Sequence, residues 1–119
     1  MISMKKEVVK ALRKIENMNV VSAFPLTLTK FPTISYVEEV NLPYMKCDGK
    51  ERITNLVYKL DLFTDKSPTE LASQVDEAMT ELGFQRKFCF EARESDKVFH
   101  KVFRYELLID SETNIIYQI

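Results

Sequence analysis

The sequence has little of the residue types on which many catalytic and metal sites depend. Its 119 residues include two glycines, two cysteines, one histidine and no tryptophan. Neither glycine opens a helix after a strand, which excludes the glycine-rich phosphate loops of the common nucleotide-binding folds. Cys47 and Cys89 form no CxxC pair and have no histidine cluster nearby. This pattern argues against a zinc site and a disulfide-rich secreted scaffold, so we expect two free thiols in a reducing compartment.

Long apolar runs and an excess of one charge are also absent. No stretch approaches the roughly 20 apolar residues of a membrane span, and the N-terminal residues do not have the order of a signal peptide. The 17 basic and 18 acidic residues leave a formal net charge of −1, without the basic field that nucleic-acid binding usually needs. We therefore expect no membrane partner and no nucleic-acid sequence recognition, in a protein kept in a cytoplasm or in a particle assembled there.

The sequence does contain enough apolar residues, 45%, for one core, so we expect residues 1–119 to form a single domain. Apolar spacings of three and four predict a helix over about Ser3–Met18. A second helix is predicted to start at Ser67, because Ser67-Pro68-Thr69-Glu70 supplies an N-cap serine, a first-turn proline and the glutamate of a capping box. Gly83 is the residue expected just past the end of this helix.

Basic residues give the first predicted helix a distinctive face. They fall mostly off its apolar stripe: Lys5, Lys6, Lys10, Arg13 and Lys14. Such a face could bind phosphate or a membrane surface, but Glu7 and Glu16 interrupt it. We interpret it as the solvated side of a helix packed on a sheet.

Alternation with period two predicts the strands. They cover Thr33–Val40, Arg52–Thr64, Phe84–Ala92, Val98–Ile109 and Ile115–Ile119, with Asn19–Pro32 as a connector and Asp110–Asn114 as a hairpin loop. The order is helix, two strands, helix, then two or three strands. We therefore predict an α+β fold in which two helices pack on one face of an antiparallel or mixed sheet of four to five strands.

Aromatic and basic residues interleave in Arg86-Lys87-Phe88-Cys89-Phe90. Some sheets stack single-stranded RNA on exposed aromatics of this kind. Because Phe84, Phe88 and Phe90 alternate regularly, we expect all three to point into the core instead.

No catalytic centre, cofactor site or metal site is predicted, and we expect the protein not to be an enzyme. His100 lies in an alternating strand between Phe99 and Lys101, which form no catalytic pattern, so we interpret it as a surface histidine on the wetter face. Asp110-Ser111-Glu112 lacks the glycine and the terminal glutamate of a calcium loop. A hairpin turn explains this segment better.

The segment Asn41–Lys50 has the features of an interaction site. It contains Pro43 and Asp48-Gly49, so we expect a loop long enough to project. It also carries Leu42, Tyr44 and Met45, and exposed apolar residues often mark a partner surface. The alternative is a loop that folds back over its own sheet.

Several segments resemble the small tail-completion or tail-terminator proteins of long-tailed bacteriophages and prophages. The resemblance covers about residues 5 to 110. It rests on Ala11-Leu12, Phe31-Pro32-Thr33-Ile34-Ser35-Tyr36, Tyr58-Lys59-Leu60-Asp61-Leu62-Phe63-Thr64, Glu70-Leu71-Ala72, Leu82-Gly83-Phe84 and Phe103-Arg104-Tyr105. The family has no catalytic signature to match, and the segment after Asp110 has no place in its pattern.

The resemblance implies a subunit of a ring of six copies, present in the virion and in the bacterial host cytoplasm during assembly. Such a ring caps the tail tube and joins it to the head connector protein. No family residue carries over as a functional site, so the interface candidates come from this sequence. They are Leu42, Tyr44, Met45, Lys46, Asp48, Lys50, Glu51, Arg52, Arg86, Lys87 and Arg93.

Other readings stay open beside the terminator role. A head–tail joining protein or another minor tail protein would have similar features. A small cytoplasmic module that binds a peptide or protein through the apolar segment belongs to a different class. An enzyme would need a site assembled from His100 and scattered carboxylates.

Overall fold

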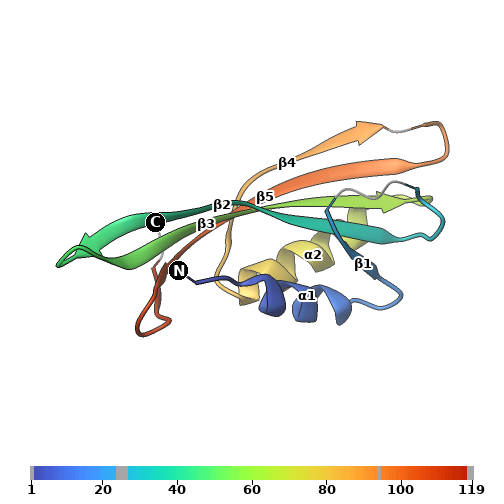
Figure 1. Ribbon diagram of the computed structural model, residues 1–119. Coiled ribbons are helices and arrows are strands. Elements are labelled where there is room, and N and C mark those ends of the chain that lie inside the picture. Colours follow the sequence, from blue (N-terminus) through green and yellow to red (C-terminus); the bar gives the residue numbers. More distant parts are fainter. Residues whose placement is uncertain (1, 24–26, 94, 118–119) are drawn as a thin grey trace.

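The computed structural model describes residues 2–23, 27–93 and 95–117 (Figure 1). Two helices and six strands follow in the order α1 (Lys5–Arg13), β1 (Asn19–Ser22), β2 (Thr33–Cys47), β3 (Lys50–Thr64), α2 (Thr69–Glu81), β4 (Gln85–Arg93), β5 (Phe99–Asp110) and β6 (Ile116–Tyr117). The predicted α+β fold is confirmed.

The six strands form one mixed sheet in the order β1-β2-β3-β5-β4. β1 is parallel to β2 and the other pairs are antiparallel. β6 pairs with Leu108 and Ile109 of β5, beyond the residues of β5 that pair with β4. The sheet has more strands than expected because β1 lies in Asn19–Pro32, which we had predicted as a connector. A four-residue strand that pairs only with the start of β2 is too short to show alternation.

Both helices pack on the same face of the sheet, as predicted (Figure 1). Val8 and Leu12 of α1 and Val75 and Met79 of α2 are fully buried. They join a core whose sheet residues are Ile34, Leu56, Tyr58, Leu60, Leu62, Phe103, Tyr105, Leu107 and Ile109. Residues of β3 and β5 therefore supply most of the sheet's contribution to the core.

The helix ends differ from the predicted ones. α1 covers Lys5–Arg13 rather than Ser3–Met18. α2 begins at Thr69, and Pro68 occupies the N-cap position without a side-chain cap. The Ser67 hydroxyl lies 3.3 Å from the Thr69 hydroxyl, so the predicted serine cap and capping box are wrong. Gly83 follows α2 with φ +100°, which confirms its predicted role.

The predicted orientation of the aromatic residues in β4 is wrong after Phe84. A register shift lies between Arg86 and Phe88, and such a bulge reverses the alternation of side chains beyond it. Cys89 therefore packs against the core. Phe88 stacks on Phe90, with ring centroids 5.6 Å apart, and the Phe90 side chain is 49% exposed.

The segment Asn41–Lys50 is a β-hairpin instead of the predicted loop. β2 continues through Pro43 to Cys47, and β3 begins at Lys50. Asp48 and Gly49 have φ values of +52° and +77°, as a two-residue primed turn requires. Pro43 is compatible with β2 because β1 pairs only with Thr33–Tyr36, which leaves this part of β2 as an edge in the described part of the chain.

Candidate functional site

The outer half of the β2–β3 hairpin, residues 42–52, forms a projecting element that we call the hairpin arm (Figure 1). The last residue of β5, Asp110, pairs with Ile53. The arm tip therefore extends beyond the end of β5. The expected projection of this segment is thus present, but a β-hairpin with register shifts on either side of Met45 makes it rather than a loop.

The arm exposes large apolar side chains. Leu42, Tyr44 and Met45 have exposed fractions of 57%, 60% and 48%. The alternative in which this segment folds back over its own sheet is therefore excluded for these three side chains. A group of exposed apolar side chains on a paired hairpin is typical of a partner contact.

Charged residues of both signs surround the apolar group. Lys46, Asp48 and Lys50 are exposed at the tip, and Glu51 is half-buried. Glu51 accepts a hydrogen bond from the hydroxyl of Thr54 on its own strand. Lys46, Asp48 and Lys50 are the candidates best placed to meet a partner.

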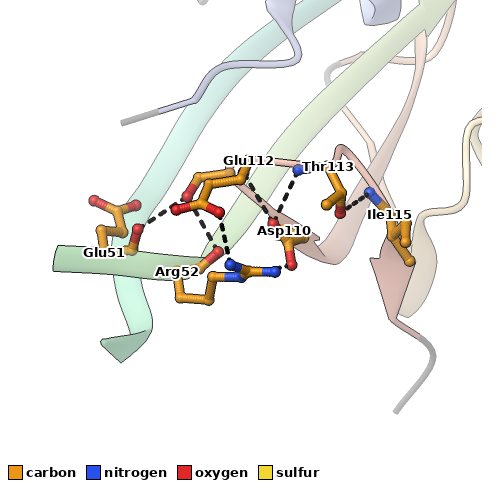
Figure 2. Close-up of polar contacts among 7 residues, drawn as sticks. Glu51, Arg52, Asp110, Glu112, Thr113 and Ile115 are labelled. Atoms are coloured by element: carbon orange, nitrogen blue, oxygen red, sulfur yellow. Dashed lines mark hydrogen bonds and ion pairs between the residues drawn. The ribbon is translucent and has the colours of Figure 1, made fainter. Parts of the chain in front are cut away.

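Arg52 holds the root of the arm to the β5–β6 turn (Figure 2). Its Nε donates to Oδ2 of Asp110 at 2.9 Å, and its Nη1 donates to Oε2 of Glu112 at 2.7 Å. The Ser111 hydroxyl donates to the backbone carbonyl oxygens of Glu51 and Arg52. We call these residues, Arg52, Asp110, Ser111 and Glu112, the clasp.

Asp110 is the buried centre of the clasp, with 2% of its surface exposed. Its Oδ1 accepts hydrogen bonds from the backbone N–H groups of Glu112 and Thr113, at 2.9 and 3.0 Å (Figure 2). The Thr113 N–H contributes most to lowering the pKa of Asp110; burial opposes this effect, and the Glu112 N–H and Arg52 lower the pKa further. The carboxylate therefore stays charged and fixes the arm to the sheet.

The clasp changes the interpretation of two sequence-predicted residues. Arg52 was a candidate for contacts with a partner, but its guanidinium is engaged within the chain. Asp110-Ser111-Glu112 forms a turn, as predicted, and in addition anchors the arm. An aspartate at a strand end, followed by serine and threonine, is a signature of such side-chain-to-backbone turns and could have indicated this role.

The remaining interface candidates lie on β4, at the opposite edge of the sheet from β2. Arg86 Nη1 lies 3.3 Å from Asp76 Oδ2, and Lys87 Nζ lies 3.2 Å from Glu106 Oε1. The backbone of Arg93 pairs with Phe99, and its side chain lies outside the described part of the structure. The two predicted sets of interface residues therefore do not form one surface.

His100 is not the exposed histidine that we predicted, because its exposed fraction is only 7%. Its Nε2 lies 2.7 Å from Asp61 Oδ1, and its ring stacks on Phe63. It lies on the face of the sheet opposite the helices, where the pairing of β3 with β5 places these three residues together. The contacts with Asp61 and Phe63 contribute to the burial of its ring.

Other kinds of site have little support among the described residues. No group of three or more histidine, cysteine, aspartate or glutamate side chains is arranged to hold a metal ion there. In the same residues, no helix is long and apolar enough to cross a membrane. Cys47 and Cys89 are both free thiols, as expected.

One comparison with known proteins gives information about the fold. No protein-family model matches the sequence, and none of the curated proteins matches it. Among solved structures, the gp17 protein of bacteriophage SPP1 is similar over 94% of this chain and 91% of its own, with a TM-score of 0.52 and 18% sequence identity. The protein therefore shares its fold with a bacteriophage protein.

Proposed function

We propose that this protein is a structural assembly subunit of a tailed bacteriophage or prophage, and specifically a tail terminator that forms a ring. The ring caps the tail tube and joins it to the head connector. Two independent arguments support this assignment: the resemblance of sequence segments to that family, and the fold shared with the gp17 protein of bacteriophage SPP1. A head–tail joining role is the alternative within the same particle.

The observation that carries the proposal is the anchored hairpin arm. Leu42, Tyr44 and Met45 are exposed on a paired hairpin whose root is fixed by Arg52 and Asp110. A preformed element loses little conformational entropy when it binds, so its apolar contacts contribute more fully to affinity. An assembly subunit that must join two other proteins needs such a rigid projecting contact.

The balance of charges in the sequence also fits a ring. A ring requires each copy to present two different complementary surfaces, one to each neighbour. With 17 basic and 18 acidic residues, the protein has both signs available for such contacts. We propose that its partners are other copies of itself, the tail tube protein and the head connector protein, that it resides in the virion, and that it acts without a cofactor or catalytic centre.

The solution mass of the purified protein tests this proposal. We expect light scattering coupled to size exclusion to give a ring, of about six copies if the family resemblance holds, or a monomer that converts to a ring when tube protein is added. A protein that stays monomeric at every concentration, with and without tube protein, would contradict the proposal. That result would favour a small protein-binding module that uses the same arm.

Arm variants test which surface makes the contact. Tyr44→Ser together with Met45→Ser should abolish capture by tube or connector protein and leave the melting temperature nearly unchanged, because both side chains are exposed. Phe90→Ser is the matched control, since Phe90 has almost the same exposed fraction as Met45 and lies on β4. Equal binding by the arm variant and the control would remove the arm from the proposal.

A further inference from the structure

Helix α1 presents a basic flank on the side that faces away from α2. Lys5, Lys6, Lys10 and Arg13 are exposed. Together with Val9 and Tyr36 they line a groove of about 450 Å³ between α1 and β2. None of these four cations forms an ion pair with another residue in the described part of the chain.

Helix α2 has the opposite charge. It contains Glu70, Asp76, Glu77 and Glu81 and has no lysine or arginine. Asp76 is engaged by Arg86 and by the Tyr105 hydroxyl. The other three are exposed, and they have no ion pair within the residues that the structure describes.

The two helices are neighbours, but the basic flank does not meet the acidic helix within one molecule. The groove between α1 and α2 is lined on one side by Ala11, Lys14, Ile15 and Glu16 and on the other by Gln74, Glu77, Ala78, Glu81 and Leu82. The basic flank is on the opposite side of α1, next to Tyr36 of β2. None of the four cations of the flank lines the groove that contains Glu77 and Glu81.

We propose that the basic flank of α1 in one copy binds α2 of the next copy. Four unpaired cations then face a helix with three unpaired carboxylates, a complementarity that sets register and orientation between subunits. Because the two surfaces differ, the contact is head-to-tail, and repetition of such a contact closes a ring when the rotation permits. This inference rests on the proposed function and identifies the surfaces through which its subunits meet.

A second copy fits the basic flank better than a nucleic acid or a lipid surface does. Val9 and Tyr36 form an apolar floor between the cations, which a helix of a partner protein can cover. The protein as a whole has a net charge of −1, which does not attract polyanions over a distance. The matching acidic helix is present in every copy.

Charge reversal tests the contact. Lys6→Glu, Lys10→Glu and Arg13→Glu together make the basic flank acidic, because only Lys5 remains positive, and Glu70→Lys, Glu77→Lys and Glu81→Lys together make α2 basic, because only Asp76 remains negative. Each triple variant should raise the dissociation constant for self-association at least ~tenfold, since like charges then face each other. Lys46→Glu, Lys50→Glu and Lys97→Glu together, compared without tube protein, are the matched control for the basic-flank variant, because they change the net charge equally at exposed positions outside both surfaces. The assay is light scattering of each protein, alone and with tube protein.

Mixing the two reversed variants gives the decisive result. Contacts between unlike variants are attractive in both directions, whereas contacts between like variants are repulsive. We therefore expect an equimolar mixture to assemble like the unmodified protein while each variant alone stays monomeric. Recovery in the mixture also demonstrates that both variants are folded, and their melting temperatures should match that of the control.

The other outcomes separate this inference from the proposed function. Assembly of both reversed variants like the control would overturn the inference and leave the ring intact. Failure of the unmodified protein to assemble, even with tube protein, would refute the proposed function and this contact together. If assembly is unchanged but the basic-flank variant loses binding to heparin or to phosphatidylglycerol vesicles, the flank is a polyanion site and the inference is wrong.

Discussion

Nε2 of His100 lies 2.7 Å from Oδ1 of Asp61, and both side chains are less than 10% exposed. The imidazole stacks on Phe63 with a centroid separation of 4.3 Å, and Nζ of Lys59 lies 3.8 Å from Oδ2 of Asp61. A buried polar pair therefore joins β5 to β3 on the face opposite α1 and α2. This arrangement gives His100 a structural role.

Loss of the imidazole should destabilise the fold. His100→Ala leaves the Asp61 carboxylate buried with Lys59 as its remaining ion-pair partner, and we expect a decrease of about 1–3 kcal/mol in the free energy of unfolding. His100→Gln is the control, since its amide can still donate to Asp61, and it should lose less. Urea unfolding monitored by circular dichroism measures both, and equal stability of His100→Ala and the unmodified protein would contradict the structural role.

The clasp predicts a stability change in acid. The pKa of Asp110 in the folded state is below its ordinary value of 3.8, mainly because of the Thr113 N–H. Its contribution to stability is therefore complete above about pH 4 and is lost as the pH falls through the lowered pKa. Asp110→Asn should melt at a lower temperature than the unmodified protein at pH 7, and this difference should shrink toward pH 2.

Glu112→Gln is the control for this experiment. It removes one ion pair of Arg52 but keeps the backbone N–H groups that bind Asp110, so most of the acid dependence should remain. The melting temperatures of Asp110→Asn and of the unmodified protein could instead differ by a constant amount from pH 7 to pH 2. That result would show that the clasp carboxylate does not support the arm.

The two glycines should respond differently to alanine. Both have a left-handed φ, but a Cβ at Gly83 would lie 2.8 Å from Cδ1 of Ile116, whereas a Cβ at Gly49 would meet nothing within 4 Å. Gly49→Ala should lower the free energy of unfolding by about 1–2 kcal/mol, because only the left-handed backbone conformation is unfavourable for alanine there. Gly83→Ala should cost more, because Ile116 of β6 must also move, and chemical denaturation that gives equal losses would contradict this contact.

The regular parts of the fold could be predicted from the sequence because their signals are local. Alternation from Arg52 to Thr64 predicted β3 almost to its ends, since one face of that strand is buried in the core. Gly83 was predicted correctly because only a left-handed residue ends α2 cheaply. The sequence also predicted a hairpin loop at Asp110–Asn114, and β5 and β6 pair on either side of it.

The elements that the sequence did not predict depend on partners distant in the chain. Pro43 and several polar residues favour a loop, and only pairing with β3 keeps β2 extended to Cys47. One extra residue in β4 reversed the direction in which the side chains of Phe88 and Phe90 point. A bulge of this kind cannot be located from the periodicity of the sequence. The sequence suggested that Arg52 could contact a partner, but the fold places its guanidinium against Asp110, 58 residues away.

The two cysteines provide a probe of the arm. Cys47 is exposed near the arm tip, whereas Cys89 is half-buried, and burial raises the pKa of the Cys89 thiol. Because the thiolate is the reactive species, Cys47 should react with a thiol reagent faster than Cys89 at mildly alkaline pH, and Cys47→Ser should lose the fast phase. If the arm contacts tube or connector protein, the assembled particle should protect Cys47 and leave the rate at Cys89 unchanged. An undiminished rate at Cys47 after assembly would place the contact elsewhere on the protein.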